Sequence, residues 1–440
     1  MNPNDPTTGA AVAPAPRRLV RFPAVLQGRD FRRFWAGETV SLLGDQITMI
    51  ALPLVGVLAL DASAAEMGYL GAAGLFPALL FSLHAGAWVD RRGRRRQTMI
   101  FTALGRAVLI ATLPLAYAFD ALTLTQLYVV SFLIGTLSVV FFVAYSTLFV
   151  SLVPREQYVE ANSLLNGSRA LSYVAGPSIG GLLVQVFSAP GALIADACSF
   201  LASAFAMSSI SPVEPPTERA ERGHIKAGVR YMWGSPIIRA SLLATATINF
   251  FNFVFWALFV LYVSRELDVP AGTLGLILGA GAVGGVIGSL VTGRISRRIG
   301  LGPAYVVGCV LFPLPLLLVP LASGPRWVVV LMLFLAEFWS GVGVMMLDIS
   351  AGSIFAALIP DRLRSRVSGA YSFVNYGVRP LGSLAGGVLG STIGLQPTLW
   401  IGAIGALAGV LWLLPSPIPR LRDLPEPEDA DGPVLADQHA

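Results

Sequence analysis

Charged residues are scarce in this sequence of 440 residues: they make up 12% of it, whereas hydrophobic residues make up 55%. A soluble protein usually carries about a quarter charged residues. The chain therefore has too few polar side chains to cover the surface of soluble domains. This scarcity disfavours a soluble enzyme, a nucleic-acid-binding protein and a secreted scaffold held by disulfides, and it indicates a polytopic membrane protein.

Cysteine is rare as well. Cys198 and Cys309 lie within apolar segments, where we expect buried small hydrophobic residues and neither a metal site nor a disulfide framework. The first 30 residues contain no apolar core, which predicts that no signal peptide is cleaved. The sequence shows no nucleotide-binding loop and no nucleophile–base set. We therefore expect neither an enzymatic activity nor a cofactor.

Long apolar runs take the place of the missing charges. A helix needs about 20 mainly apolar residues to cross the hydrocarbon core, and backbone polar groups in lipid must satisfy one another. The runs therefore predict an all-α integral membrane protein. We expect twelve transmembrane helices, at residues 34–58, 67–89, 97–118, 124–151, 161–186, 190–210, 241–263, 271–293, 302–322, 327–352, 367–392 and 396–415.

The basic residues predict the orientation of these helices. If the N-terminus is cytoplasmic, the cytoplasmic segments hold 25 of the 30 basic residues, whereas the opposite loops hold only Arg265 and Arg326. Short cytoplasmic loops carry an excess of Lys and Arg. The split predicts a multi-pass protein of the cell membrane with both termini in the cytoplasm.

A break in the hydrophobic pattern at residues 211–240 divides the helices into two sets of six. In this linker, Ile225, Val229, Met232 and Trp233 recur at helical spacing, which predicts an interfacial amphipathic helix. A solvated connector is an equally good alternative. We predict a cytoplasmic N-terminal arm at 1–33, a six-helix bundle at 34–210, the cytoplasmic linker at 211–240, a second six-helix bundle at 241–415 and a disordered acidic tail at 416–440.

The two halves repeat each other. Residues 147–154 match residues 353–360 at an offset of 206, and residues 86–93 match residues 293–300 at an offset of 207. The offset of 206 also places three glycines on three others, Gly176, Gly180 and Gly181 on Gly382, Gly386 and Gly387. Because six is even, both halves enter the membrane in the same direction. Such a parallel repeat is typical of transporters in which two bundles rock around a site at the middle of the membrane.

Several segments resemble the major facilitator superfamily. Residues 86–95 are similar to its loop signature, with Gly86, Asp90, Arg91, Gly93 and Arg94 as the gating residues. Residues 175–181 are similar to the antiporter motif of exporters, with Gly176, Pro177, Gly180 and Gly181. Residues 41–54 and 377–382 are similar to the macrolide-efflux and enterobactin-exporter branch. The resemblance implies the major facilitator fold, with twelve helices in two six-helix bundles related by pseudo-twofold symmetry, and a proton-coupled exporter of drugs or siderophores.

The resemblance also assigns roles to the two motifs. It implies that Asp90 contacts the start of the eleventh helix, around residues 365–368, where a helix N-terminus favours an anion. The contact latches the halves together on the cytoplasmic side; a plain positive-inside loop is the alternative. In the antiporter motif, Pro177 kinks the helix and the glycines allow close packing. This motif predicts a hinge or seal on the outer side, or routine packing between helices.

Charges inside the spans each cost roughly 2.5–3.5 kcal/mol on insertion scales if unpaired, so we expect them to face a cavity or a partner. The candidates for proton coupling are Glu38, Asp45, Arg169, Glu337, Asp348 and Arg379. Counted along the helices, Asp45 and Arg169 reach similar depths. Glu337 and Arg379 do so as well. The depths predict two carboxylate–guanidinium pairs, each of which keeps its acid ionised until a proton or a substrate displaces it; static structural pairs are the alternative.

Two other spans modify this expectation. Arg106 and Asp196 lie on the third and sixth helices, which the resembling fold places outside the cavity, so we expect them to form structural pairs. The fourth helix, residues 124–151, holds no charge. The arginine that many drug antiporters carry in that helix therefore has no counterpart here.

Aromatic residues crowd the seventh helix and recur elsewhere, which suits a cavity for a bulky amphipathic ligand. The candidate cavity residues are Phe142, Tyr145, Asn249, Asn252, Phe253, Trp256, Tyr371 and Tyr376. The leading hypothesis is export of such a compound by proton exchange, with alternating access. An uptake symporter for a small polar solute and a non-transporting membrane scaffold are the alternatives. The expected partners are a small-molecule substrate, protons and the lipid bilayer, without nucleic acid, and we expect a monomer.

Overall fold

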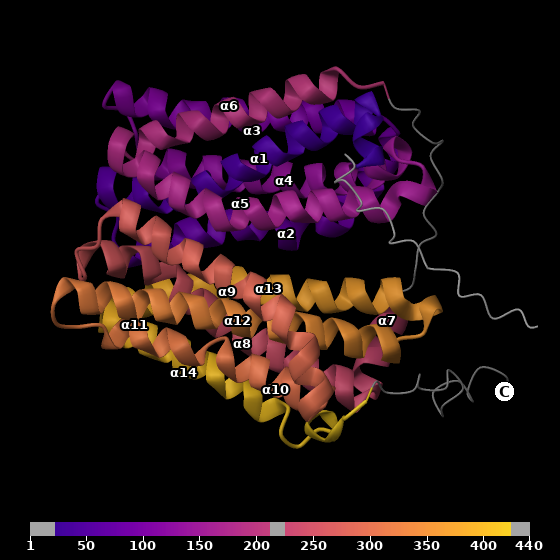
Figure 1. The fold of residues 1–440 in the computed structure, drawn as a ribbon. Helices are drawn as coiled ribbons and strands as arrows, with labels where there is room; N and C mark the ends of the chain where they lie inside the picture. The colour runs from indigo at the N-terminus through magenta and orange to yellow at the C-terminus, as the bar shows by residue number, and fades with distance from the viewer. Residues whose placement is uncertain (1–22, 212–224, 424–440) are drawn as a thin grey trace, which may run out of the picture.

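The structure is a computed structural model that describes residues 23–211 and 225–423, and every regular element in these residues is helical. Six long helices form the N-terminal bundle: α1 (Arg29–Leu54, continued by η2, Val55–Ala59), α2 (Ala64–Arg92), α3 (Arg95–Ala118), α4 (Leu124–Leu152), α5 (Tyr158–Phe187) and α6 (Ala189–Ser208). The C-terminal bundle contains α8 (Pro236–Arg265), α9 (Ala271–Ile299), α10 (Leu301–Leu311), η4 (Leu314–Leu317), α11 (Leu318–Leu321), α12 (Arg326–Leu358), α13 (Asp361–Ile393) and α14 (Leu395–Ala408). Figure 1 shows the two bundles as separate layers, indigo to magenta and pink to yellow.

Eleven helical spans of the described residues are long and apolar enough to cross a membrane. The twelfth, α13, is 33 residues long but less apolar, because its first turns are polar and Asn375 and Arg379 lie near its centre. Large apolar side chains such as Phe101, Phe119 and Phe205 are exposed on the outer helices. In a membrane protein such a surface faces lipid. The predicted all-α membrane fold is confirmed.

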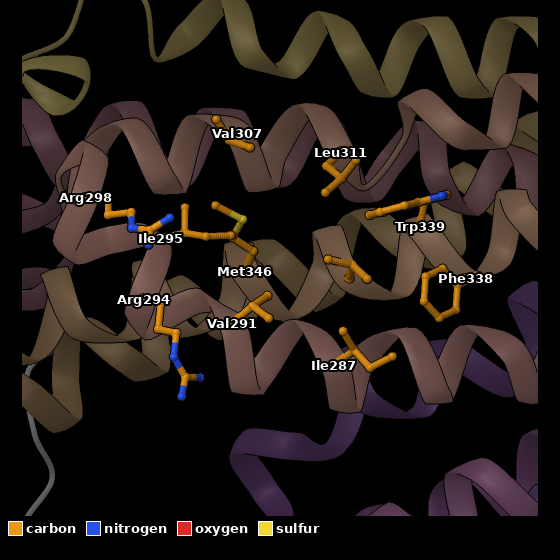
Figure 2. A pocket seen from close by; sticks show the side chains of 11 residues that line it. Ile287, Val291, Arg294, Ile295, Arg298, Val307, Leu311, Phe338, Trp339 and Met346 are labelled. Carbon is orange, nitrogen blue, oxygen red and sulfur yellow. The ribbon is translucent and has the colours of Figure 1, made fainter.

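The ninth span is not the continuous helix that residues 302–322 predict. It is broken into α10, η4 and α11, since Pro313 and Pro315 lack the backbone N–H that an α-helix needs. Figure 2 shows Val307 and Leu311 on the short helix α10. The break leaves α10 as a helix of 11 residues beside much longer neighbours.

Two other local expectations meet different outcomes. Cys309 is buried, but the prediction for Cys198 is wrong, because its side chain is exposed. It lies on α6 in a stripe of exposed apolar residues with Ile194 and Leu201, so it faces outward with them.

In the linker, a helix does form, α7 (Ile225–Gly234). Its Met232 is buried against the C-terminal bundle, while the side chains of residues 225–229 lie outside the described part.

The repeat extends to the backbone of the loops. Among the described residues, eight have positive φ, and they fall into four pairs, one member in each half: Asp61 with Asp268, Gly93 with Gly300, Asp120 with Gly324, and Ser188 with Gly394. The first pair is preceded by equivalent backbone hydrogen bonds, in which the N–H of Leu60 and that of Leu267 donate to carbonyls five residues earlier. Duplicated loop geometry of this kind supports the internal repeat.

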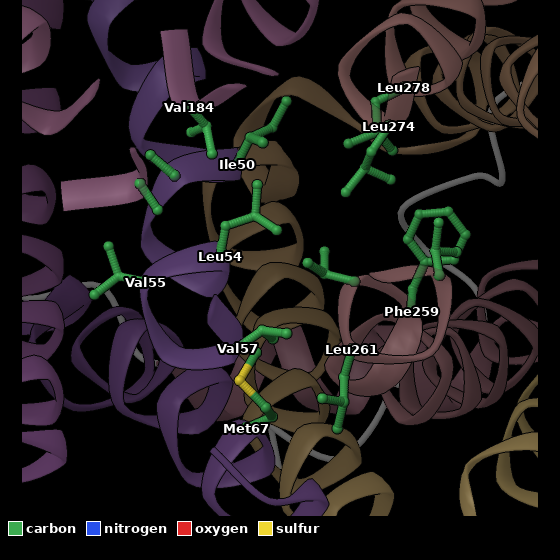
Figure 3. Packing of buried hydrophobic residues seen from close by; sticks show 14 of the residues in the cluster. Ile50, Leu54, Val55, Val57, Met67, Val184, Phe259, Leu261, Leu274 and Leu278 are labelled. Carbon is green, nitrogen blue, oxygen red and sulfur yellow. The ribbon is translucent and has the colours of Figure 1, made fainter. Parts of the chain in front are cut away.

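The bundles meet at one end of the helices. We call this end, which holds the loops around Asp61, Asp120, Ser188, Asp268 and Gly324, the arginine-poor end, and the opposite end the arginine-rich end. A hydrophobic cluster at the arginine-poor end contains residues of both bundles, including Leu54 and Val57 of the first and Phe259 and Leu274 of the second (Figure 3). The other two clusters are each confined to one bundle. Apolar contact between the bundles is therefore concentrated at the arginine-poor end.

Two glycine pairs bring the bundles into backbone contact there. Gly68 of α2 faces Gly387 of α13, and a Cβ atom on Gly68 would lie 2.6 Å from the Cα of Gly387. Gly181 of α5 faces Gly275 of α9 in the same way, at 2.9 Å. Gly68 and Gly275 are 207 residues apart and Gly181 and Gly387 are 206 apart. The two glycine contacts are therefore equivalent under the internal repeat, because each half supplies one glycine of each kind.

Polar contacts between the bundles lie at the same end. Gln185 of α5 accepts a hydrogen bond from the N–H of Gly272 at 3.1 Å, and Arg265 at the end of α8 forms an ion pair with Asp61. Towards the arginine-rich end, added Cβ atoms on Gly86, Gly167 and Gly369 would meet nothing within 4 Å. The described conformation is therefore closed at the arginine-poor end and parted at the other.

We predict that Gly181→Ala destabilises this closed end by about 1–3 kcal/mol, because the added methyl overpacks a backbone contact. The reporter is a Leu54→Cys thiol in a Cys198→Ala/Cys309→Ala background, reacted with a maleimide in nanodiscs. Leu54 is buried in the cluster that joins the bundles, so its labelling rate reports opening. The control is Gly167→Ala on the same helix, which meets open space. Equal labelling rates in the two variants would contradict the prediction.

Candidate functional site

Helix α1 carries the acidic candidates Glu38 and Asp45, and small residues place it close to α6. A Cβ atom on Gly37 would lie 2.7 Å from the Cβ of Ala206, and one on Gly44 would lie 2.7 Å from the Cβ of Ser199. Interfaces between membrane helices use small residues for such approaches. The close packing brings Asp45 within reach of side chains on α3 and α6.

Asp45 pairs with Arg106 of α3, at 3.6 Å between Oδ1 and Nη1. The Asp45 side chain is 41% exposed, whereas that of Arg106 is 3% exposed. The guanidinium lies over the rings of Phe141 at 4.4 Å and Phe200 at 4.2 Å, and cations are attracted to such ring faces. The acid is therefore accessible, while its partner is held in place by packing.

A second carboxylate belongs to the same cluster. The hydroxyl of Thr48 and that of Ser199 donate to the two oxygens of Asp196, the second at 2.8 Å. Asp196 is fully buried and interacts electrostatically with both Asp45 and Arg106. Two carboxylates thus lie near one guanidinium, and of the two only Asp45 forms an ion pair with it. With all three groups ionised, the cluster carries one unbalanced negative charge, which is costly at low dielectric.

The predicted pairing of Asp45 with Arg169 is wrong in this conformation. No ion pair joins Asp45 to Arg169 in the described residues, and Arg106, expected to be a structural residue outside the cavity, holds Asp45. Depth along the helices was the only guide from the sequence, and depth does not distinguish an arginine on α5 from one on α3. The packing of α6 against both α1 and α3 decides between them.

Glu38 lies on α1 two helical turns before Asp45. Its side chain is buried, and its Oε2 has no hydrogen-bond partner among the described residues. Tyr145 of α4 is electrostatically coupled to it. The Tyr145 ring stacks on Phe34 with 5.5 Å between centroids. Glu38 lies nearer the arginine-rich end than Asp45 and interacts electrostatically with Asp45 and Arg106, and also with Arg169.

In the C-terminal bundle, the predicted pair of Glu337 and Arg379 is wrong, because the described residues contain no such ion pair. Glu337 is buried between α12 and α9 beside Gly281. Arg379 lies over the rings of Tyr376 at 4.3 Å and Phe253 at 5.3 Å. Asp348 is the acidic residue that interacts electrostatically with Arg379, without an ion pair between them in the described residues. Gly281 and Gly284 of α9 pack closely on α12 at this point, and Glu337 lies on the side of α12 that faces α9.

The other cavity candidates divide into polar and apolar groups. Asn249 donates a hydrogen bond of 2.7 Å to the side chain of Asn375, and Tyr371 donates one of 2.8 Å to Thr245. Neither Asn375 nor Thr245 was singled out from the sequence, because uncharged polar residues are common in membrane helices. Asn252 is buried with its Oδ1 unpartnered among the described residues.

The aromatic candidates behave differently from one another. Trp256 packs against Phe259, at 4.9 Å between centroids, within the cluster that closes the arginine-poor end. It therefore contributes to the seal. Phe142 is 65% exposed and makes no ring contact within the described residues. Tyr376 is exposed and lies under Arg379.

The loop motif at 86–95 forms the end of α2 and the start of α3. Gly93 caps α2 in the left-handed conformation, with φ of 63°. Arg91 and Arg94 are exposed, and the neighbouring Arg96 donates to the last carbonyls of α6. The side chains of Asp90 and Ser365 lie outside the described part, so the latch stays a prediction.

The antiporter motif on α5 contacts two helices. Gly176 and Gly180 face Gln46 and Ile47 of α1, and Gly181 faces α9. Pro177 is buried within α5, and its carbonyl lies against Gly275. The motif thus connects the helix that bears Asp45 with the contact between the bundles. In the described part of the chain, no group of His, Cys, Asp and Glu residues is arranged to hold a metal ion.

Known proteins are similar to this chain in sequence and in fold. The sequence matches the Major Facilitator Superfamily profile over residues 34–383 and again over residues 241–437. It is 29% identical over 407 residues to the multidrug efflux pump Tap of Mycolicibacterium fortuitum, covering 87% of this chain and 93% of that protein. It is 24% identical over 380 residues to the staphyloferrin A transporter of Staphylococcus aureus, covering 85% and 93%. The fold is similar to the inward-facing crystal structure of a bacterial homologue of the iron transporter ferroportin, with a TM-score of 0.73, 16% identity, and 88% and 98% coverage.

We predict that Asp45 is energetically coupled to Arg106 and not to Arg169. Free energies of unfolding measured by SDS titration in mixed micelles for Asp45→Asn, Arg106→Met and the double variant should give a coupling energy of about 1 kcal/mol, as expected for residues in contact. The matched cycle with Arg169→Met should give a value near zero. The reverse ranking of the two cycles would restore the pairing with Arg169.

Proposed function

Because the chain belongs to the major facilitator superfamily, we propose that it exports hydrophobic or amphipathic small molecules in exchange for protons, by alternating access. It is a secondary transporter with a small-molecule substrate and not an enzyme. The proton coupling, the direction of transport and the class of substrate are the parts that we propose. The positive-inside distribution of arginines supports an orientation in which both termini lie in the cytoplasm of a cell membrane, and we propose a monomer.

The observation that carries the proposal is the presence of two carboxylates near one guanidinium: Asp45 forms an ion pair with Arg106, and Asp196 interacts electrostatically with both. If both acids are ionised, the uptake of one proton makes the cluster neutral. Asp45 is the exposed member of the cluster and is the group that a proton reaches. A protonated Asp45 no longer holds Arg106 by charge, which frees α1 to shift against α3 and α6. In this way proton binding is coupled to a movement of the helices.

The movement is between two arrangements of the bundles. With the arginine-rich end in the cytoplasm, the described conformation faces inward and is closed on the outer side by the glycine pairs and the apolar cluster. In the opposite arrangement the cytoplasmic side closes, and we propose that Asp90 then contacts the start of α13. The antiporter motif transmits the change, because its glycines touch both α1 and α9.

The proposed class of substrate rests on the aromatic and amide residues of the C-terminal bundle. Tyr376 and Phe253 flank Arg379, and Asn249 and Asn375 present an amide pair close by on α8 and α13. Aromatic surfaces with a few polar groups suit amphipathic compounds. The similarity to a multidrug efflux pump supports export.

We predict that Asp45→Asn abolishes ethidium transport driven by a pH gradient in proteoliposomes, because the variant has no proton to exchange at this position. Ethidium counterflow, which needs no net proton movement, should persist. The matched control is Asp120→Asn, in the loop after α3 and far from the cluster, which should transport normally.

Gradient-driven transport at the wild-type rate by Asp45→Asn would exclude Asp45 as the coupling acid. The direction of movement is a second readout. An exporter of this type moves ethidium against the proton flux, whereas movement in the same direction as the protons would favour the uptake symporter.

A further inference from the structure

A cleft opens on the outer surface of the C-terminal bundle, away from the candidate site. Its cavity volume is about 510 Å³, and it lies between α9, α10 and α12. The walls are apolar along most of their length, with Val291 on α9, Val307 on α10 and Met346 on α12 (Figure 2). Arg294 and Arg298 lie at one end.

The packing of the three helices explains the cleft. Helix α12 approaches α9 closely, since a Cβ atom on Gly288 would lie 2.8 Å from the carbonyl oxygen of Val342. It approaches α10 equally closely, since one on Gly343 would lie 2.7 Å from the carbonyl oxygen of Leu311. Helices α9 and α10 contact each other only slightly. The cleft is therefore a groove between α9 and α10 with α12 as its floor.

The length of the groove matches one leaflet of a bilayer. On α9 it runs from Ile287 to Arg298, which is about 16 Å at the rise of an α-helix. Half of the hydrocarbon core is about 15 Å. The two arginines follow the apolar wall at the arginine-rich end, so they lie where the headgroups of that leaflet begin. An acyl chain and a headgroup thus fit the groove in that order.

The charges at the end of the groove select the headgroup. Arg294 and Arg298 are exposed, and neither forms an ion pair with an acidic side chain in the described ranges 23–211 and 225–423. Guanidinium groups bind phosphate oxygens through paired hydrogen bonds. Basic pockets between membrane helices bind anionic lipid headgroups.

We propose that an anionic glycerophospholipid of the leaflet at the arginine-rich end binds this groove. One acyl chain lies along Ile287, Val291 and Met346, and the phosphate contacts Arg294 and Arg298. The proposal does not depend on the transported substrate or on proton coupling, because none of the candidate transport residues lines the groove.

The test uses the purified full-length protein and native mass spectrometry, with phosphatidylglycerol and phosphatidylcholine as probes. The wild type should bind phosphatidylglycerol more tightly, and Arg294→Gln/Arg298→Gln should weaken this binding about thirtyfold, as expected for the loss of two basic residues near a lipid surface. Binding of phosphatidylcholine should change little. The matched control is Arg297→Gln, which removes a charge from the same helix at a position that does not line the groove.

A second variant tests the acyl chain. Val291→Trp fills the groove and should weaken the binding of both lipids, while inorganic phosphate at millimolar concentration should not displace either. Equal loss of phosphatidylglycerol in Arg297→Gln and in the double variant would overturn the proposal. So would displacement by phosphate, unchanged binding by Val291→Trp, or equal affinity of the wild type for the two lipids.

Discussion

Direct backbone contact at two glycine pairs holds the two bundles together, and the rest of the described conformation depends on it. Lipid chains are as apolar as leucine side chains, so apolar area alone does not draw the bundles together. Gly68 against Gly387 and Gly181 against Gly275 supply close van der Waals contact at symmetry-related places. Because both pairs lie at the arginine-poor end, the helices part towards the other end. One type of glycine contact, duplicated by the repeat, thus closes one end of the molecule.

The bundles differ in what they hold between these contacts. The N-terminal bundle places two carboxylates, Asp45 and Asp196, near Arg106, whereas the C-terminal bundle places Arg379 over two aromatic rings. The repeat therefore conserves the framework of helices and loops but not the charges. In the proposed antiport, this difference would assign the protons mainly to the first bundle and the organic substrate mainly to the second. The antiporter motif lies between the two, because α5 contacts both α1 and α9.

The sequence predicted the framework better than the pairing of charges. Hydrophobic length and the offset of the glycines are properties of the chain alone, and they led to the membrane fold and to the equivalence of Gly181 and Gly387. Arg169 lies on α5, which packs directly on α1, and Arg106 lies on α3, which reaches α1 through α6. The choice of Arg106 over Arg169 therefore depends on the side of α1 that carries Asp45 in the folded bundle, and a count of depth along each helix contains no such information. The break of the ninth span follows from Pro313 and Pro315, which interrupt the helix although the surrounding run is apolar throughout. The roles of the candidate residues and the latch at Asp90 remain predictions.

The ion pair between Asp61 and Arg265 has a consequence of its own. It joins the two bundles at the closed end, yet the Asp61 side chain is 95% exposed, and salt weakens pairs in such surroundings. The glycine contacts and the apolar cluster beneath it do not respond to ions. The balance between the closed and open arrangements therefore has a minor component that varies with the ionic strength of the medium bathing that surface, while the buried polar residues of the candidate site stay shielded from it.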